Sequence, residues 1–88
     1  MSNVTKTDHS DQFRDAIARV VADRIRLQYK TVYRFSQVSG VNMSTLNGLL
    51  KHGKSPSAYL LSQIEAGFGK PAGWLMRVAS EEVTYATK

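Results

Sequence analysis

The side chains able to do covalent or metal chemistry in this chain are few and lie far apart in the sequence. The chain has no cysteine, which excludes thiolate nucleophiles, thiolate metal sites and disulfides. His9 and His52 are its only histidines, and neither has a second ligand at metal-binding spacing. No pair of carboxylates is placed for acid–base work. The sequence therefore predicts no catalytic residue, no metal and no cofactor, and we do not expect an enzyme.

Hydrogen bonding to nucleic-acid bases is a second kind of chemistry, and one short segment carries the side chains for it. Asn47 can pair with N6 and N7 of adenine, Ser44 can donate or accept, and Met43 can contact a thymine methyl group. In a helix these three positions share one face. Lys51 and Lys54 follow, where cations can meet phosphates without strict geometry.

Two short helices hinged at Gly40 are predicted to position these residues. Apolar residues fall near helical spacing on both sides of the hinge: Val32, Phe35 and Val38, then Leu46, Leu49 and Leu50. Thr31 is a suitable N-cap for the first helix, and Asn42 or Ser44 for the second. Gly40 supplies the positive φ that a tight turn requires. This is the helix-turn-helix plan, which offers its second helix to a DNA major groove.

Residues 32–51 resemble the helix-turn-helix of the phage repressor and Cro family. Ser36 stands at the family's small residue, five positions in, and Gly40 at its turn glycine. The family's apolar positions four, ten, fifteen and eighteen hold Phe35, Val41, Leu46 and Leu49. The family's basic loop, proline and fourth helix are matched by Lys54-Ser55-Pro56-Ser57 and by Leu60, Leu61, Ile64 and Phe68. The resemblance covers roughly residues 12–78.

The chain also departs from the family pattern. Val32 stands where the family often has a glutamine that binds a DNA phosphate, and Ser39 where alanine is usual. Leu50 replaces a common glutamate, and Gly53 comes one place late. These departures affect the DNA contacts more than the fold.

The resemblance implies an all-α, lambda-repressor-like fold, a compact bundle of about five helices with the helix-turn-helix at the second and third. It implies a sequence-specific regulator of transcription, a Cro-like repressor that binds a two-fold DNA operator as a homodimer. Met43, Ser44 and Asn47 would contact bases, and Gly40 would form the turn. The residues expected at the DNA backbone are Tyr33, Arg34, Asn42, Thr45, Lys51, Lys54 and Ser55.

The distribution of charge agrees with a DNA partner. The net charge is +5. Six basic residues and no acidic one lie between positions 24 and 54: Arg24, Arg26, Lys30, Arg34, Lys51 and Lys54. This basic window coincides with the helix pair, as expected for salt-dependent phosphate contacts. A solvated basic face is the alternative interpretation.

Eighty-eight residues suit one domain. We expect a flexible N-terminus over residues 1–9, the DNA-binding domain over 10–78 and a tail over 79–88. Neither a secretory signal nor an apolar run of membrane-spanning length is present, so a bacterial cytoplasmic location is expected. The first helix should run from about Asp11 to Leu27. The fourth should start at Ser55-Pro56 and end at Gly67 and Gly69, and the fifth should run from Ala72 to about Val78.

Some positions admit two interpretations. Tyr29 can close the core or reach the DNA backbone. Gly48 can admit a close approach of DNA or accommodate packing inside the protein. Trp74 can seal the core or, with Met76 and Tyr85, form dimer contacts. The tail can be loose, or its partial alternation can form a strand that pairs across a dimer.

Two other functions remain open. The chain could be an antitoxin, a module that binds a toxin or another protein and uses its helix-turn-helix for autoregulation. It could also be an excision factor that bends DNA.

Overall fold

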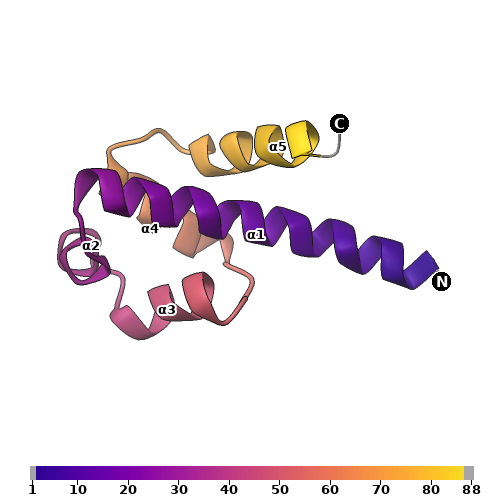
Figure 1. Cartoon of the computed structure of the whole chain (residues 1–88). Helices are drawn as coiled ribbons and strands as arrows, with labels where there is room; N and C mark the ends of the chain where they lie inside the picture. The colour runs from indigo at the N-terminus through magenta and orange to yellow at the C-terminus, as the bar shows by residue number, and fades with distance from the viewer. Residues whose placement is uncertain (1, 87–88) are drawn as a thin grey trace.

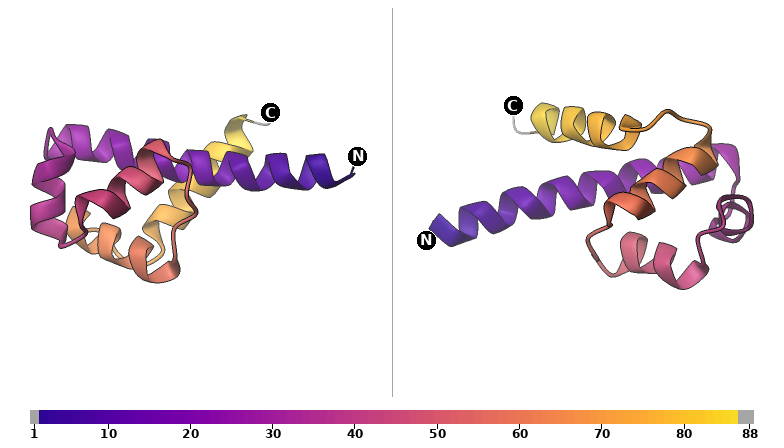
Figure 2. Two further views of the ribbon diagram at one scale, coloured as in Figure 1. Left: turned by 90° about the horizontal axis from the view of Figure 1, so that it is seen from below. Right: turned by 180° about the vertical axis from the view of Figure 1, so that it is seen from behind.

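The computed structural model describes the backbone of residues 2–86 and the side chains of residues 12–83. Over this range the chain forms five helices and no strand (Figure 1): α1 (Ser2–Gln28), α2 (Val32–Ser39), α3 (Met43–Lys51), α4 (Ala58–Phe68) and α5 (Trp74–Ala86). The predicted all-α bundle of about five helices is confirmed. The arrangement places α3 and α5 on opposite sides of α1 (Figure 2).

The three central helices begin at side-chain caps. The Thr31 hydroxyl accepts from the Arg34 N–H, and Asn42 Oδ1 accepts from the Thr45 N–H at 2.8 Å. The expected start of the fourth helix at Ser55-Pro56 is wrong. Ser57 is the cap, its hydroxyl accepts from the Leu60 N–H, and Pro56 lies in the loop before it. Each cap satisfies a backbone donor that the first turn leaves unpaired.

α1 begins earlier than the expected Asp11. Its backbone is helical from Ser2, although residues 1–9 were expected to lie outside the folded domain. Residues 2–28 contain neither glycine nor proline, so no residue of the segment interrupts the helical hydrogen bonds. Met1 lies outside the described residues.

α5 corrects the expectation of a tail over residues 79–88. The helix starts at Trp74 and continues to Ala86, so the strand and the loose tail are both wrong as far as that residue. Leu75, Ala79 and Val83 are buried at intervals of four residues, which is helical spacing. They give α5 an apolar face that packs on α1. Residues 87–88 lie outside the described residues.

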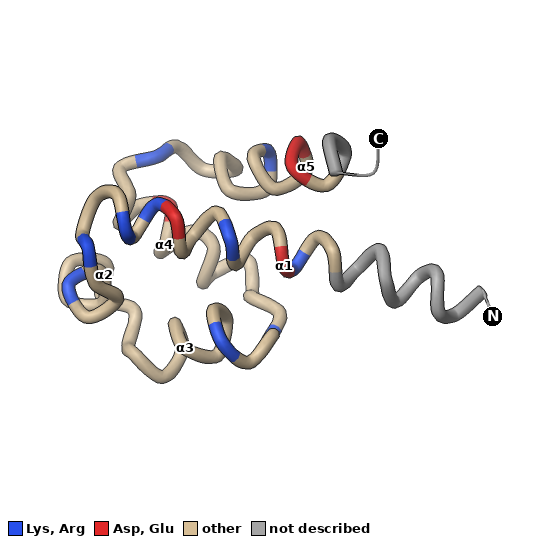
Figure 3. Tube along the Cα trace, in the orientation of Figure 1, with Lys and Arg blue, Asp and Glu red and all other residues tan. Residues whose placement is uncertain are grey.

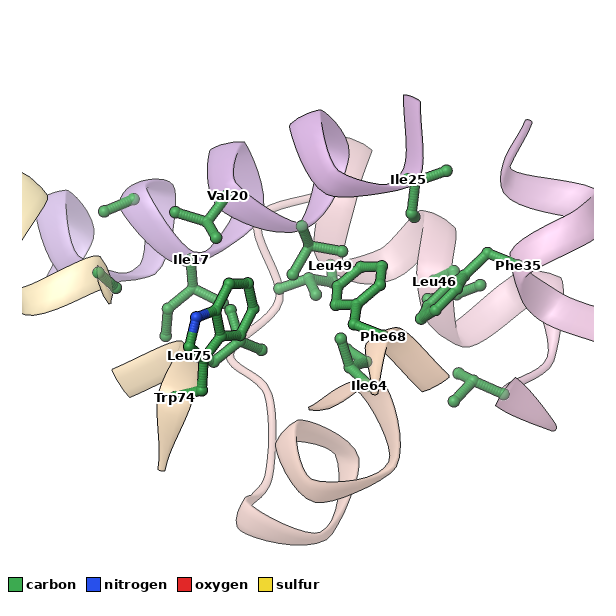
Figure 4. Packing of buried hydrophobic residues seen from close by; sticks show 14 of the residues in the cluster. Ile17, Val20, Ile25, Phe35, Leu46, Leu49, Ile64, Phe68, Trp74 and Leu75 are labelled. Carbon is green, nitrogen blue, oxygen red and sulfur yellow. The ribbon is translucent and has the colours of Figure 1, made fainter. Parts of the chain in front are cut away.

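An aromatic cluster forms the centre of the core (Figure 4). The rings of Phe35 and Phe68 stack with centroids 4.5 Å apart, and Trp74 meets Phe68 edge-on at 6.1 Å. Tyr29 packs against Phe35 and donates its hydroxyl proton to the Gly67 carbonyl. Tyr29 therefore closes the core. The rest of the core comes from α1, α3, α4 and α5, in particular from Ile17, Val21, Ile25, Leu46, Leu49, Ile64 and Leu75.

Trp74, expected as a possible dimer contact, lies in the core. Its side chain is 8% exposed, and Arg24 and Lys70 each lie within about 5.5 Å of its ring centroid. Little of the ring remains for a partner, because α1 and α4 cover it. Met76 is 44% exposed and stays a candidate for a dimer contact. The side chain of Tyr85 lies outside the described residues.

A buried carboxylate joins α4 to α5. Glu65 is 4% exposed, and its two oxygens accept from the N–H groups of Gly73 and Leu75, at 3.2 and 2.8 Å. Glu65 thus caps the first turn of α5 from a neighbouring helix.

Gly69 ends α4 in the left-handed conformation, while Gly67, expected to help end it, lies inside the helix.

Candidate nucleic-acid interface

The turn between α2 and α3 is fixed by four residues. Gly40 has φ of 80° and ends α2, and its N–H donates to the Ser36 carbonyl. The Ser36 hydroxyl donates to the Val41 carbonyl at 2.7 Å, and the Val41 N–H donates to the Ser39 hydroxyl. Val41 is buried beneath the turn. These bonds set the angle between α2 and α3, so the outward face of α3 has a defined direction.

The residues predicted to contact bases lie on the outward side of α3. Met43 is 37% exposed, Ser44 is exposed and Asn47 is half-buried. Leu46 and Leu49 occupy the opposite side and are buried in the core. Thr45 and Lys51 are also exposed and lie beside this face. The structure therefore brings together the three predicted base-contacting residues and two of the predicted backbone contacts.

Gly48 does not lie open on this face. It is buried, and a Cβ atom added there would lie 3.3 Å from Cδ of Lys54. The aliphatic part of the Lys54 side chain thus packs against α3 at the position where residue 48 would carry a side chain. Of the two interpretations of Gly48, packing inside the protein is the one that the structure supports.

The outer side of α2 presents a hydrogen-bonded pair. Tyr33 is 60% exposed, and its phenol oxygen accepts from Nε2 of Gln37 at 2.8 Å. Phe35, on the opposite side of the helix, is buried. Gln37 was not among the predicted site residues. Its spacing of four from Tyr33 is the signal in the sequence that could have identified the pair.

Four of the six cations of the basic window are exposed to solvent and lie in neither an ion pair nor a cation–π contact among the described residues. Arg26 pairs with Asp23 at 2.7 Å, and Arg24 lies over the Trp74 ring. Among the described residues no ion pair engages the other four, which are Lys30, Arg34, Lys51 and Lys54. They lie on α2, on α3 and in the adjoining turns, where Figure 3 shows no acidic residue. The positive charge around the helix pair is therefore not neutralised from within the described part of the chain.

A hollow of about 470 Å³ lies between α3 and the start of α4. Five polar residues line its α3 side and the loop, beside apolar residues such as Leu49 and Pro56: Ser44, Thr45, Lys54, Ser55 and Ser57. It also reaches Tyr59 and Gln63 on α4. The predicted backbone contacts Thr45, Lys54 and Ser55 thus meet around one concave surface beside the outward face of α3.

Comparison of the chain with protein-family models, with curated proteins and with solved structures finds no match. What α2 and α3 can do is therefore inferred from their own geometry. In the described part of the chain, no group of three or more His, Cys, Asp or Glu side chains could hold a metal ion. No described helix combines the length and apolar character needed to cross a membrane.

Proposed function

We propose that this chain binds double-stranded DNA through α2 and α3 and regulates transcription as a small repressor. The observation that carries the proposal is the outward face of α3. It presents Met43, Ser44 and Asn47 beside four exposed cations, with no acidic residue between positions 24 and 64. The alternative, a polar helix face that only contacts solvent, would require neither the absence of acidic residues around it nor a rigid turn that fixes its direction.

In this proposal α3 enters the major groove. Asn47 pairs with an adenine, Ser44 supplies an adaptable hydrogen bond, and Met43 contacts a thymine methyl group. Lys51 and Arg34 meet phosphates on the groove's rims, where they release counterions and make affinity salt-dependent. The Asn42 amide is available to the backbone through its NH₂ group, because its oxygen already caps α3.

The proposed assembly is a homodimer on a two-fold operator. Two recognition helices related by the two-fold axis would reach half-sites about one helical turn apart, roughly 34 Å. Such a dimer represses by covering a promoter. Two of the expected dimer contacts, Trp74 and Met76, have described side chains. Of these, Met76 on α5 is the one that is exposed.

The test is binding to DNA from the region upstream of the chain's own coding sequence, measured by fluorescence anisotropy at several salt concentrations and by footprinting. We expect protection of a palindrome and a linear fall of log affinity with log salt. Protection of one bent site without repression would favour the excision-factor alternative. Failure to bind any duplex in a salt-dependent manner would refute the proposal and leave the protein-binding alternative.

Two substitutions separate the proposed roles within that test. Asn47→Ala should alter the preference among operator variants by about 1–3 kcal/mol at one base pair. Lys51→Ala should weaken binding to every sequence alike and reduce the salt slope by about one. Unchanged relative affinities in Asn47→Ala would remove Asn47 from the base-contacting set.

A further inference from the structure

The loop after α3 returns one lysine to the helix surface. The backbone N–H groups of His52 and Lys54 both donate to the Gly48 carbonyl, at 3.3 and 3.0 Å. Gly53, between them, has φ of 65°, a conformation that side chains rarely allow. This turn fixes the backbone of Lys54 against the last turn of α3.

The Lys54 side chain then lies along α3 across Gly48. The Cβ position of residue 48 is 3.3 Å from Lys54 Cδ, 3.8 Å from Cγ and 3.9 Å from Cβ. From Cδ the ammonium is only two bonds away, each about 1.5 Å. The ammonium therefore lies within about 3 Å of Cδ, so it can reach the volume that a long side chain at position 48 would occupy.

Position 48 belongs to the part of α3 that the proposed function places in the major groove. It lies four residues after Ser44 and three before Lys51, so the three positions follow one another along the helix surface. Gly48 contributes no side chain of its own there. Ser44, Gly48 and Lys54 also line the same hollow.

We propose that Lys54 determines specificity by contacting a base, taking the place of the side chain that α3 lacks at position 48. A lysine ammonium in the major groove donates to O6 and N7 of guanine. The sequence alone places Lys54 among the phosphate contacts, since it follows the helix in a basic loop. The inference rests on the proposed function and adds one guanine to the operator that α3 recognises.

The experiment is selection of preferred sites from a randomised DNA duplex library by the full chain and its variants. Lys54→Ala should lose the preference for guanine at one position, by roughly tenfold or more, and keep the preferences set by Ser44 and Asn47. Lys54→Gln should move that position from guanine toward adenine, because a glutamine amide pairs with adenine. Lys51→Ala is the matched control, and it should leave the selected motif unchanged.

The outcomes distinguish the two proposals. If Lys54→Ala weakens binding to all sequences alike and lowers the salt slope as Lys51→Ala does, Lys54 is a phosphate contact and the inference is wrong. If the unsubstituted chain binds DNA but selects no guanine at any position, the inference is also wrong while DNA binding stands. If the unsubstituted chain binds no duplex, the proposed function fails and the inference fails with it.

Discussion

Glu65 is a buried polar residue whose substitution should lower the stability of the fold. Its carboxylate satisfies two backbone donors, those of Gly73 and Leu75, in a site that is 4% exposed. Glu65→Ala leaves both N–H groups unpaired, and we expect a loss of about 2–4 kcal/mol in the free energy of unfolding, measured by urea titration. Glu82→Ala is the matched control. Its ion pair with Arg19 is exposed and contributes at most about 1 kcal/mol.

Two glycines inside helices should respond in opposite directions to alanine. At Gly67 the new Cβ would lie 2.8 Å from ring carbon Cε1 of Phe35 and 2.8 Å from Cβ of Ser39. Gly67→Ala should therefore destabilise the fold by about 1–3 kcal/mol, because α2 and α4 must separate. At Gly48 the nearest atom is the flexible Lys54 Cδ, so Gly48→Ala should stabilise by up to about 1 kcal/mol. Thermal unfolding gives the sign of the change in midpoint temperature for each variant. A higher midpoint in Gly67→Ala would contradict the packing argument.

At the scale of the elements, the end of α1 contains a strained residue. Lys30 has φ of 71°, and its N–H donates to the Ile25 carbonyl at 2.8 Å in the manner of a helix C-cap. A side chain in this conformation costs roughly 1 kcal/mol, which glycine avoids. We expect Lys30→Gly to raise the midpoint of urea unfolding without changing the slope. A lower midpoint would show that the lysine side chain stabilises the turn by more than the strain costs.

Helix existence follows from the sequence, whereas the ends of the helices depend on tertiary contacts. Thr31 and Gly40 carry local signals that the structure uses as expected, and of the two predicted caps of α3, Asn42 and Ser44, it uses Asn42. The extension of α5 was missed because the spacing of Ala79 and Val83 becomes meaningful only once α1 provides a surface to cover. The sequence favours Ser55 as the cap because Pro56 follows it, whereas the path of the loop makes Ser57 the cap.

In the candidate site, too, local features follow from the sequence, whereas features that depend on tertiary contacts do not. The outward positions of Met43, Ser44 and Asn47 follow from the periodicity of Leu46 and Leu49. The approach of Lys54 to Gly48 does not, because it depends on the left-handed turn at Gly53 and on a carbonyl that accepts two hydrogen bonds. Glu65 falls within an apolar stripe, and the donors that satisfy it lie on the next helix.

For the whole molecule, the division between α3 and α5 predicts that stability and DNA preference can be changed separately. A chain ending at Val78 loses Ala79 and Val83 from the surface of α1, and we expect it to lose at least about 2 kcal/mol of unfolding free energy. The preferences set by α3 should persist in the fraction that stays folded, since α3 and α5 lie on opposite sides of α1 (Figure 1). Urea titration tests the expected loss of unfolding free energy, and competition between operator variants tests whether the DNA preferences persist. Unchanged stability would mean that residues 79–86 contribute nothing to the fold.

Trp74 gives this protein an internal optical reporter. It is the chain's one tryptophan, and its indole ring lies between the core and two cationic side chains. Its emission should shift to longer wavelength when α5 leaves α1, and it should change little when DNA meets α3 on the other side of the molecule. In one sample, tryptophan emission can therefore report folding while a dye on the DNA reports binding. The two signals distinguish a variant that fails to bind from one that fails to fold.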